Sequence, residues 1–142
     1  MYVDAILQTK GVVVHTLPET GTLSDAVAVL NANNIGAVVI TDVRGAIIGI
    51  LSERDIVRRI GKDPAGALSL RISECMTRGV VTCSRTTILA DVMERMTRLR
   101  IRHMPVTEGG ALVGIVSIGD VVKFKIEEIE HEAEVLREYI SS

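Results

Sequence analysis

The sequence is poor in aromatic residues, with no Trp, one Phe and two Tyr among its 142 residues. Proteins that bind single-stranded nucleic acid stack bases on aromatic side chains, so this composition argues against that function. An excess of one charge is also lacking, since 16 Lys and Arg stand against 18 Asp and Glu and leave a formal net charge of −2. A net charge this small gives no field that would recruit nucleic acid or an anionic membrane surface.

Cysteines and long apolar runs are scarce as well. Cys75 and Cys83 lie eight residues apart without companions at metal-ligand spacing, which predicts two reduced thiols and no metal site. No run approaches the roughly 18 apolar residues that span a bilayer, and the first residues lack a basic-then-apolar targeting pattern. We therefore expect a cytoplasmic protein with no nucleic-acid or membrane partner.

An internal repeat, by contrast, fills most of the chain. Two related units predict that neither closes a core alone and that the function lies where they meet. At a spacing of 66 residues, the matched pairs are Thr16 and Thr82, Thr20 and Thr86, Leu23 and Leu89, Asp25 and Asp91, Ile35 and Ile101, and Thr41 and Thr107. At a spacing of 65 they are Gly45 and Gly110, Ala46 and Ala111, Gly49 and Gly114, Ile50 and Ile115, Ser52 and Ser117, Asp55 and Asp120, and Val57 and Val122.

Each copy is expected to form strand, helix, strand, strand and helix. In the first copy we expect a strand at 12–14, a helix from 23 capped by Thr22 or Ser24, and a hairpin of strands over 36–40 and 46–51. A second helix should open at Ser52 and end at Gly61. Its inward residues are expected to be Ile56, Val57 and Ile60.

The second copy predicts the same order, with a strand at 80–81, a helix near 88–99, a hairpin over 103–116 and a helix from Ser117. Pro105 cannot donate to a strand ladder, so its strand should lie at an edge or turn this nitrogen away from a neighbour. Residues 72–76 resemble residues 3–7, which gives each copy a short lead-in helix. The expected divisions are 1–66 for the first repeat, 67–125 for the second and 126–142 for a C-terminal amphipathic helix, with 61–66 as the linker.

The two segments that come after the hairpins carry a resemblance to a known family. Residues 49–55 and 114–120 resemble the signature of CBS domains, which are named after cystathionine beta-synthase. Residues 102–106 are similar to the second-strand segment of that family, and residues 74–77 to its interdomain segment. The resemblance implies an α+β fold of two pseudo-symmetric β-α-β-β-α repeats, with small three-stranded sheets packed with helices. It is closest to a stand-alone pair of the bacterial or archaeal type, here followed by a long C-terminal helix.

The resemblance also implies a function, which is the binding of an adenine nucleotide such as AMP, ATP or NAD(H) by a regulatory module. Such a module would act as an energy or redox sensor and modulate a partner protein. The alternative is an interaction or dimerisation module without a ligand. An enzyme is not expected, because the chain shows no nucleophile beside a base, no metal cluster and no Walker loop.

The chemistry of the two signatures can be argued from Ser52 and Asp55, and from Ser117 and Asp120. A strand gives way to a helix at each serine, so free backbone N–H groups and the positive helix end favour an anionic or polar ligand. A carboxylate three residues later can accept hydrogen bonds from both ribose hydroxyls. The alternative is a capping box that needs no ligand, and the two roles can coexist.

The copies differ where a phosphate would need charge, because Arg102 and His103 stand where the first copy has Gly36 and Ala37. The N–H groups of an arginine side chain pair well with phosphate oxygens, so one of the two repeats should have the better phosphate site. The alternative is that Arg102 lies on a solvated surface together with Arg98 and Arg100. The expected nucleotide-binding residues are Gly36, Ala37, Ser52, Arg54, Asp55, Thr77, Arg102, His103, Ser117, Ile118, Gly119 and Asp120, with no catalytic or metal-binding residue.

The tail predicts a long helix with an apolar seam at coiled-coil spacing. This seam would pack on the lead-in helices of the same chain or pair with another chain. We favour a homodimer, because symmetric dimers are the commonest assembly. The seam residues are Val122, Ile126, Ile129, Ala133, Leu136 and Ile140.

Overall fold

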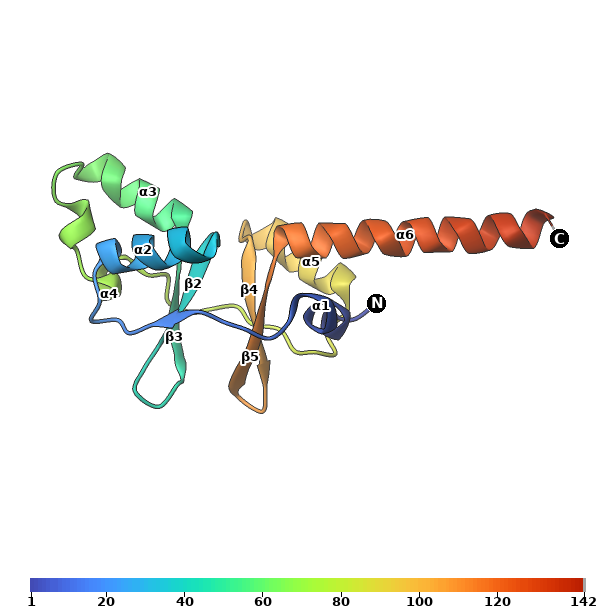
Figure 1. Ribbon diagram of the computed structural model, residues 1–142, viewed down its shortest axis with the longest axis horizontal. Helices are drawn as coiled ribbons and strands as arrows, with labels where there is room; N and C mark the ends of the chain where they lie inside the picture. Colours follow the sequence, from blue (N-terminus) through green and yellow to red (C-terminus); the bar gives the residue numbers. More distant parts are fainter. Residues whose placement is uncertain (142) are drawn as a thin grey trace. The chain divides into compact units, whose positions relative to one another are not determined.

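The computed structural model describes residues 1–141 (Figure 1). Contacts divide the chain into two compact units. Unit 1 contains residues 1–12, 82–107 and the chain from 114, and unit 2 contains residues 13–81 and 108–113. The elements in chain order are α1 (Val3–Lys10), β1 (Thr16–Leu17), α2 (Leu23–Asn33), β2 (Ala37–Thr41), β3 (Ile47–Ser52), α3 (Glu53–Lys62), the 3₁₀ turn η1 (Ala67–Ser69), α4 (Ile72–Cys75), α5 (Leu89–Leu99), β4 (His103–Glu108), β5 (Ala111–Ser117) and α6 (Ile118–Ser141).

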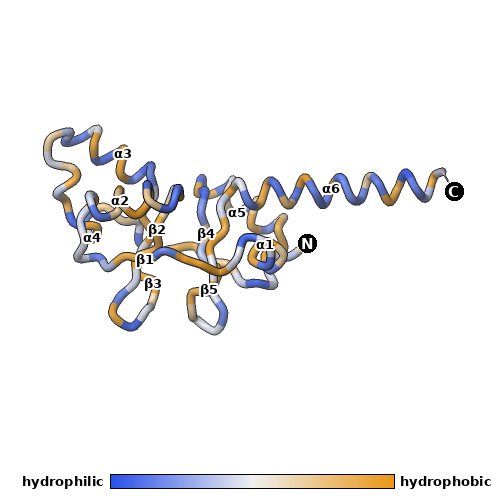
Figure 2. Tube along the Cα trace, in the orientation of Figure 1, coloured by the Kyte–Doolittle hydropathy of each residue, from blue (hydrophilic) through white to orange (hydrophobic). Residues whose placement is uncertain are grey.

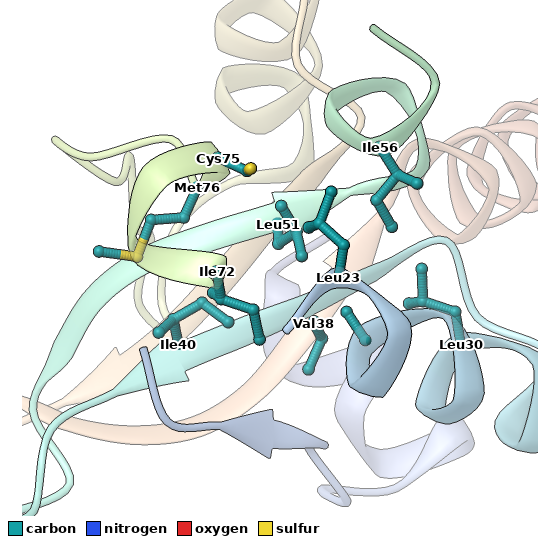
Figure 3. Close-up of a cluster of buried hydrophobic side chains, with 10 residues drawn as sticks. Leu23, Leu30, Val38, Ile40, Leu51, Ile56, Ile72, Cys75 and Met76 are labelled. Carbon is teal, nitrogen blue, oxygen red and sulfur yellow. The ribbon is translucent and has the colours of Figure 1, made fainter. Parts of the chain in front are cut away.

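Unit 2 is built on a three-stranded sheet in the order β1-β2-β3, with β1 parallel and β3 antiparallel to β2. The helix α2 begins at Thr22, whose hydroxyl accepts the Asp25 N–H while the Asp25 carboxylate accepts the Thr22 N–H, a reciprocal cap that fixes this start. Apolar side chains from α2, β2, β3, α3 and α4 then meet in one core, shown in Figure 3. Its buried members are Leu23, Ala26, Leu30, Val38, Ile40, Leu51, Ile56, Ile72, Cys75 and Met76.

The second sheet has two strands, β4 and β5, where the sequence predicted three. The position of the missing strand is reduced to a single parallel bridge between Cys83 and Val106. The Cys83 N–H donates to the Pro105 carbonyl at 3.0 Å, so the carbonyl of this proline pairs although its nitrogen cannot. In a two-stranded sheet every strand is an edge, as Pro105 predicted. The helices of unit 1 pack together, with α6 against α5 and α1.

The lead-in segments pack with the opposite repeat from the one they precede in sequence. The Val3 N–H donates to the Thr87 carbonyl at 2.9 Å, which ties α1 to the loop before α5. The Ile72 N–H donates to the Gly21 carbonyl at 2.8 Å, which ties α4 to the loop before α2. The compact units therefore cross the repeat boundaries drawn from the sequence.

Three local expectations were wrong. Residues 12–14 form no strand, and Val12 and Val13 are 55% and 75% exposed, because β2 pairs with Thr16 and Leu17 instead. Residues 80–81 likewise lie outside any strand. In α3, Ile56 is buried as expected, but Val57 and Ile60 are 66% and 39% exposed.

The long helix α6 buries Val121 and Phe124 and leaves its seam uncovered within this chain. Hydrophobic and hydrophilic residues alternate along α6 to its end (Figure 2). These seam residues are therefore largely exposed in the single chain, although α6 also contacts the lead-in helix α1 of the same unit. The exposed seam residues are Val122 at 38%, Ile126 at 50%, Ile129 at 54%, Leu136 at 58% and Ile140 at 75%.

Gly114 in β5 lies where a side chain would collide with α1. A Cβ built there would stand 2.6 Å and 3.1 Å from the two methyl carbons of Leu7, which is only 2% exposed. Gly114→Ala should therefore lower the free energy of unfolding by about 1 to 3 kcal/mol, as overpacking of a filled core does. Urea unfolding measures this loss. Gly61→Ala is the control, because no atom lies within 4 Å of its Cβ position, and it should be neutral or stabilising; equal effects at both positions would contradict the argument.

Candidate functional site

Two matched turns join the second strand of each hairpin to the helix after it. We call them the Asp55 turn (residues 52–55) and the Asp120 turn (residues 117–120). In the Asp55 turn, the Ser52 N–H donates to Asp55 Oδ2 at 2.9 Å and the Asp55 N–H donates to Ser52 Oγ at 3.3 Å. In the Asp120 turn, the Ser117 N–H donates to Asp120 Oδ2 at 2.9 Å and the Asp120 N–H donates to Ser117 Oγ at 3.2 Å. The capping bonds are therefore present in both turns.

The cap leaves part of each carboxylate for other contacts. Asp55 Oδ2 accepts the Ser52 N–H and hydroxyl, and Asp120 Oδ2 accepts the Ser117 N–H and the Lys10 ammonium, so Oδ1 of each carboxylate takes no part in the cap. A carboxylate oxygen has two acceptor positions, and a ribose diol needs two acceptors in all. The capping role and a ligand role are thus compatible at the level of single atoms.

The structure brings the segment before each hairpin strand beside the start of the helix. The Glu53 N–H donates to the Gly36 carbonyl at 2.9 Å, and the Ile118 N–H donates to the Arg102 carbonyl at 2.8 Å. Ala37 also pairs with Ser52 in the register of β2 and β3. Gly36 and Ala37 therefore belong with the Asp55 turn, and Arg102 belongs with the Asp120 turn.

The remaining predicted residues lie on the same elements. Arg54 is exposed on the first turn of α3, Gly119 is exposed on the first turn of α6, and His103 is half-buried at the start of β4. Arg102 is exposed, whereas Arg98 makes a surface ion pair with Glu94 on its own helix at 3.0 Å. The backbone carbonyl of Arg102, bonded to the Ile118 N–H, places Arg102 at the Asp120 turn.

A different donor reaches each carboxylate from the lead-in segment. The Thr77 hydroxyl, in the segment that resembles the interdomain segment of the family, lies 3.4 Å from Asp55 Oδ1. The Lys10 ammonium donates to Asp120 Oδ2 at 2.7 Å and to the Ile115 carbonyl at 3.1 Å. Sequence reasoning missed Lys10, because 110 positions separate it from Asp120 and no local pattern marks it.

Lys10 changes the electrostatics of the Asp120 turn. Burial acts to raise the pKa of Asp120, but the hydrogen bond from Lys10, the backbone N–H of Ser117 and the lysine charge together outweigh it. The pKa of Asp120 consequently lies below its ordinary value, so the carboxylate is ionised at neutral pH. An ionised carboxylate is the form that accepts hydrogen bonds from hydroxyl groups.

Metal-ligand groups, thiols and helix length can also be described for this part of the chain. Within residues 1–141, no three His, Cys, Asp or Glu side chains are grouped so that they could hold a metal ion. Both thiols are free and buried, and desolvation, opposed by the charge of Arg95, raises the pKa of Cys83 to about 11. No helix among these residues has the length and apolar character to cross a membrane.

Comparison with known proteins agrees with the residue pattern. The family model of the CBS domain matches residues 6–62 and 72–127. The CBS-domain containing protein ATU1752 from Agrobacterium tumefaciens is 42% identical, with a TM-score of 0.86, and the match covers 88% of this chain and 99% of that one. The curated mitochondrial protein CBSX3 of Arabidopsis thaliana is 35% identical over 123 residues. These residues are 84% of this chain and 60% of CBSX3, so the relative is the longer protein.

Two further solved structures contain bound ligands. The CBS domain protein PAE2072 from Pyrobaculum aerophilum, in complex with AMP, is 28% identical with a TM-score of 0.74, over 84% of this chain and 89% of that one. The CBS domain pair of protein MJ0100, in complex with 5'-methylthioadenosine and S-adenosyl-L-methionine, is 25% identical with a TM-score of 0.80, over 90% of this chain and 98% of that one.

Proposed function

Because the chain belongs to the CBS-domain family, we propose that it is a regulatory module that binds adenosine-containing ligands at the Asp55 and Asp120 turns. The observation that carries this proposal is the pair of matched turns, each with a capping carboxylate beside the carbonyl that precedes a hairpin strand. The AMP, 5'-methylthioadenosine and S-adenosyl-L-methionine bound to the two structural neighbours support the ligand class.

In the proposed mode, Asp120 accepts the two ribose hydroxyls through its carboxylate while it caps α6. The positive end of the α6 dipole and the Arg102 guanidinium then face the phosphate. Asp55 does the same in the other repeat, beside Gly36 and Ala37. Since Gly36 and Ala37 supply space and no charge, the Asp55 turn is proposed to take a larger or less phosphate-dependent ligand, of which NAD(H) is one candidate.

The module is proposed to report the bound ligand to a partner protein, as an energy or redox sensor without a catalytic step of its own. A homodimer held by the exposed seam of α6 is the assembly we propose. The competing function is an interaction module with no ligand, which the same exposed seam favours. The cytoplasmic location expected from the sequence stays a prediction.

A ligand panel separates the two functions. The full chain is melted alone and with AMP, ADP, ATP, NAD, NADH, adenosine and S-adenosylmethionine, and each hit is titrated by calorimetry. A ligand present at 100 times its dissociation constant stabilises the folded state by about 2.7 kcal/mol, which shifts the melting temperature by several degrees. A ligand-free interaction module would give no shift with any member of the panel, and this result would contradict the proposed function.

A further inference from the structure

The lead-in segments reach the two hairpins in equivalent ways. Gly49 of β3 faces Met76, which comes directly after α4, and Gly114 of β5 faces Leu7 of α1. A Cβ at either glycine would come within 2.6 Å of a side-chain atom of its neighbour, so the close approach is the same in both repeats. Thr77, directly after Met76, and Lys10, three residues after Leu7, each contact the carboxylate of the turn in their own unit.

In unit 2, the residue after Met76 supplies two neutral donors. The Thr77 N–H donates to the Ile50 carbonyl at 2.9 Å, and the Thr77 hydroxyl lies 3.4 Å from Asp55 Oδ1. The backbone N–H of Thr77 therefore bonds a strand carbonyl, and its hydroxyl lies beside the Asp55 carboxylate.

In unit 1, one ammonium group serves the two matching acceptors. Lys10 Nζ donates to the carbonyl of Ile115, the counterpart of Ile50, at 3.1 Å, and to Asp120 at 2.7 Å. The helix α1 runs on to Lys10, whereas α4 ends at Cys75, so a long side chain replaces an extended backbone. The donor beside the Asp55 carboxylate, Thr77, is therefore neutral, whereas the donor beside the Asp120 carboxylate, Lys10, carries a full positive charge.

The charges of the first residues of α3 and α6 do not offset this difference in charge between the two turns. The Asp55 turn has Glu53 and Arg54, which carry opposite charges, whereas the Asp120 turn has the uncharged Ile118 and Gly119. The lysine has three N–H donors, of which two are used, and its side chain is 36% exposed. One N–H donor of the ammonium group is therefore left for a ligand while the bond to Asp120 remains.

We propose that Lys10 is a specificity-determining residue of the Asp120 turn, which makes this turn select phosphorylated adenosine ligands over neutral ones. It donates its third N–H to a phosphate oxygen while its bond to Asp120 remains. The Asp55 turn, with Thr77 in its place, lacks this preference. The inference rests on the proposed function and adds to it a residue that lies outside both signatures.

The test compares AMP with adenosine, two ligands that differ only in the phosphate. Calorimetry is done on the full chain carrying Asp55→Ala, so that the measured binding comes from the Asp120 turn. Adding Lys10→Met, which keeps most of the apolar stem, should lower the affinity for AMP about tenfold or more and leave that for adenosine equal or higher. Lys10→Arg should retain the preference for AMP. Lys123→Met is the matched control, because it removes an exposed charge from α6 and should change neither affinity.

Every outcome of this experiment bears on the proposal. Equal losses for AMP and adenosine in Lys10→Met would overturn it, because Lys10 would then only position Asp120, and so would unchanged affinities. A melting curve for each variant shows whether a loss of affinity comes from unfolding. If Lys10→Met unfolds, Lys10→Arg is the deciding variant. A folded Lys10→Arg variant that no longer prefers AMP over adenosine also overturns the proposal, because it retains the positive charge. If the unaltered chain binds neither ligand, the proposed function fails and this inference fails with it, whereas AMP binding without a Lys10 effect removes this inference alone.

Discussion

Replacing Asp120 with alanine is expected to weaken AMP binding to the full chain at least tenfold. The substitution removes an ionised acceptor for the ribose hydroxyls, and hydrogen bonds to charged groups contribute about 1.5 to 3 kcal/mol. It also leaves the Lys10 ammonium without its carboxylate partner, so the phosphate contact becomes less well placed. Calorimetry with AMP measures the loss.

Asp120→Ala also removes a helix cap, so its effect on stability must be separated from its effect on binding. The chain offers a matched control in Asp25, which makes the same reciprocal bonds with Thr22 at 2.9 Å and 3.2 Å and lies in neither turn. Asp25→Ala should cost about 1 kcal/mol of stability, as the loss of a cap does, and leave AMP affinity unchanged. If the two alanine variants lose AMP affinity equally, or neither does, ribose recognition by Asp120 is contradicted.

The sequence predicted the architecture well wherever the signal was local or repeated. The hairpins, the caps at Thr22 and Ser52, and the helices from 23, 53 and 89 are each encoded in a short stretch of residues. The repeat itself predicted that Asp55 and Asp120 occupy matched turns, and the capping bonds confirm that they do.

The failures share one physical cause, which is pairing between residues distant in sequence. Residues 12–14 have strand propensity, but hydrogen bonding to Val39 and Ile40 selects Thr16 and Leu17. Apolar spacing in α3 placed Val57 inward, yet periodicity reports only the neighbours on one helix and not which face the rest of the unit covers. The exchange of lead-in segments has the same origin, and it brings Lys10 to Asp120.

The largest effect on assembly is expected from the seam of α6. Ile129 and Leu136 lie two turns apart on the seam and are 54% and 58% exposed in the single chain, so a second copy would gain by covering them. Full burial of such a side chain is worth about 1.5 to 3 kcal/mol, and a dimer buries both residues from both chains. We expect Ile129→Gln with Leu136→Gln to raise the dimer dissociation constant about 100-fold or more, measured by light scattering across a concentration series.

Glutamine is a good helix former, so the double variant should keep α6 helical and change only the seam. Glu130→Gln with Glu134→Gln introduces the same residue at two exposed positions off the seam and should leave the dimer intact. AMP affinity should stay near its original value in both variants, because the Asp55 and Asp120 turns lie entirely before Val121. A dimer that survives the seam variant, or an unaltered chain that is monomeric at high concentration, would remove the seam as the self-association surface and leave it for a different protein.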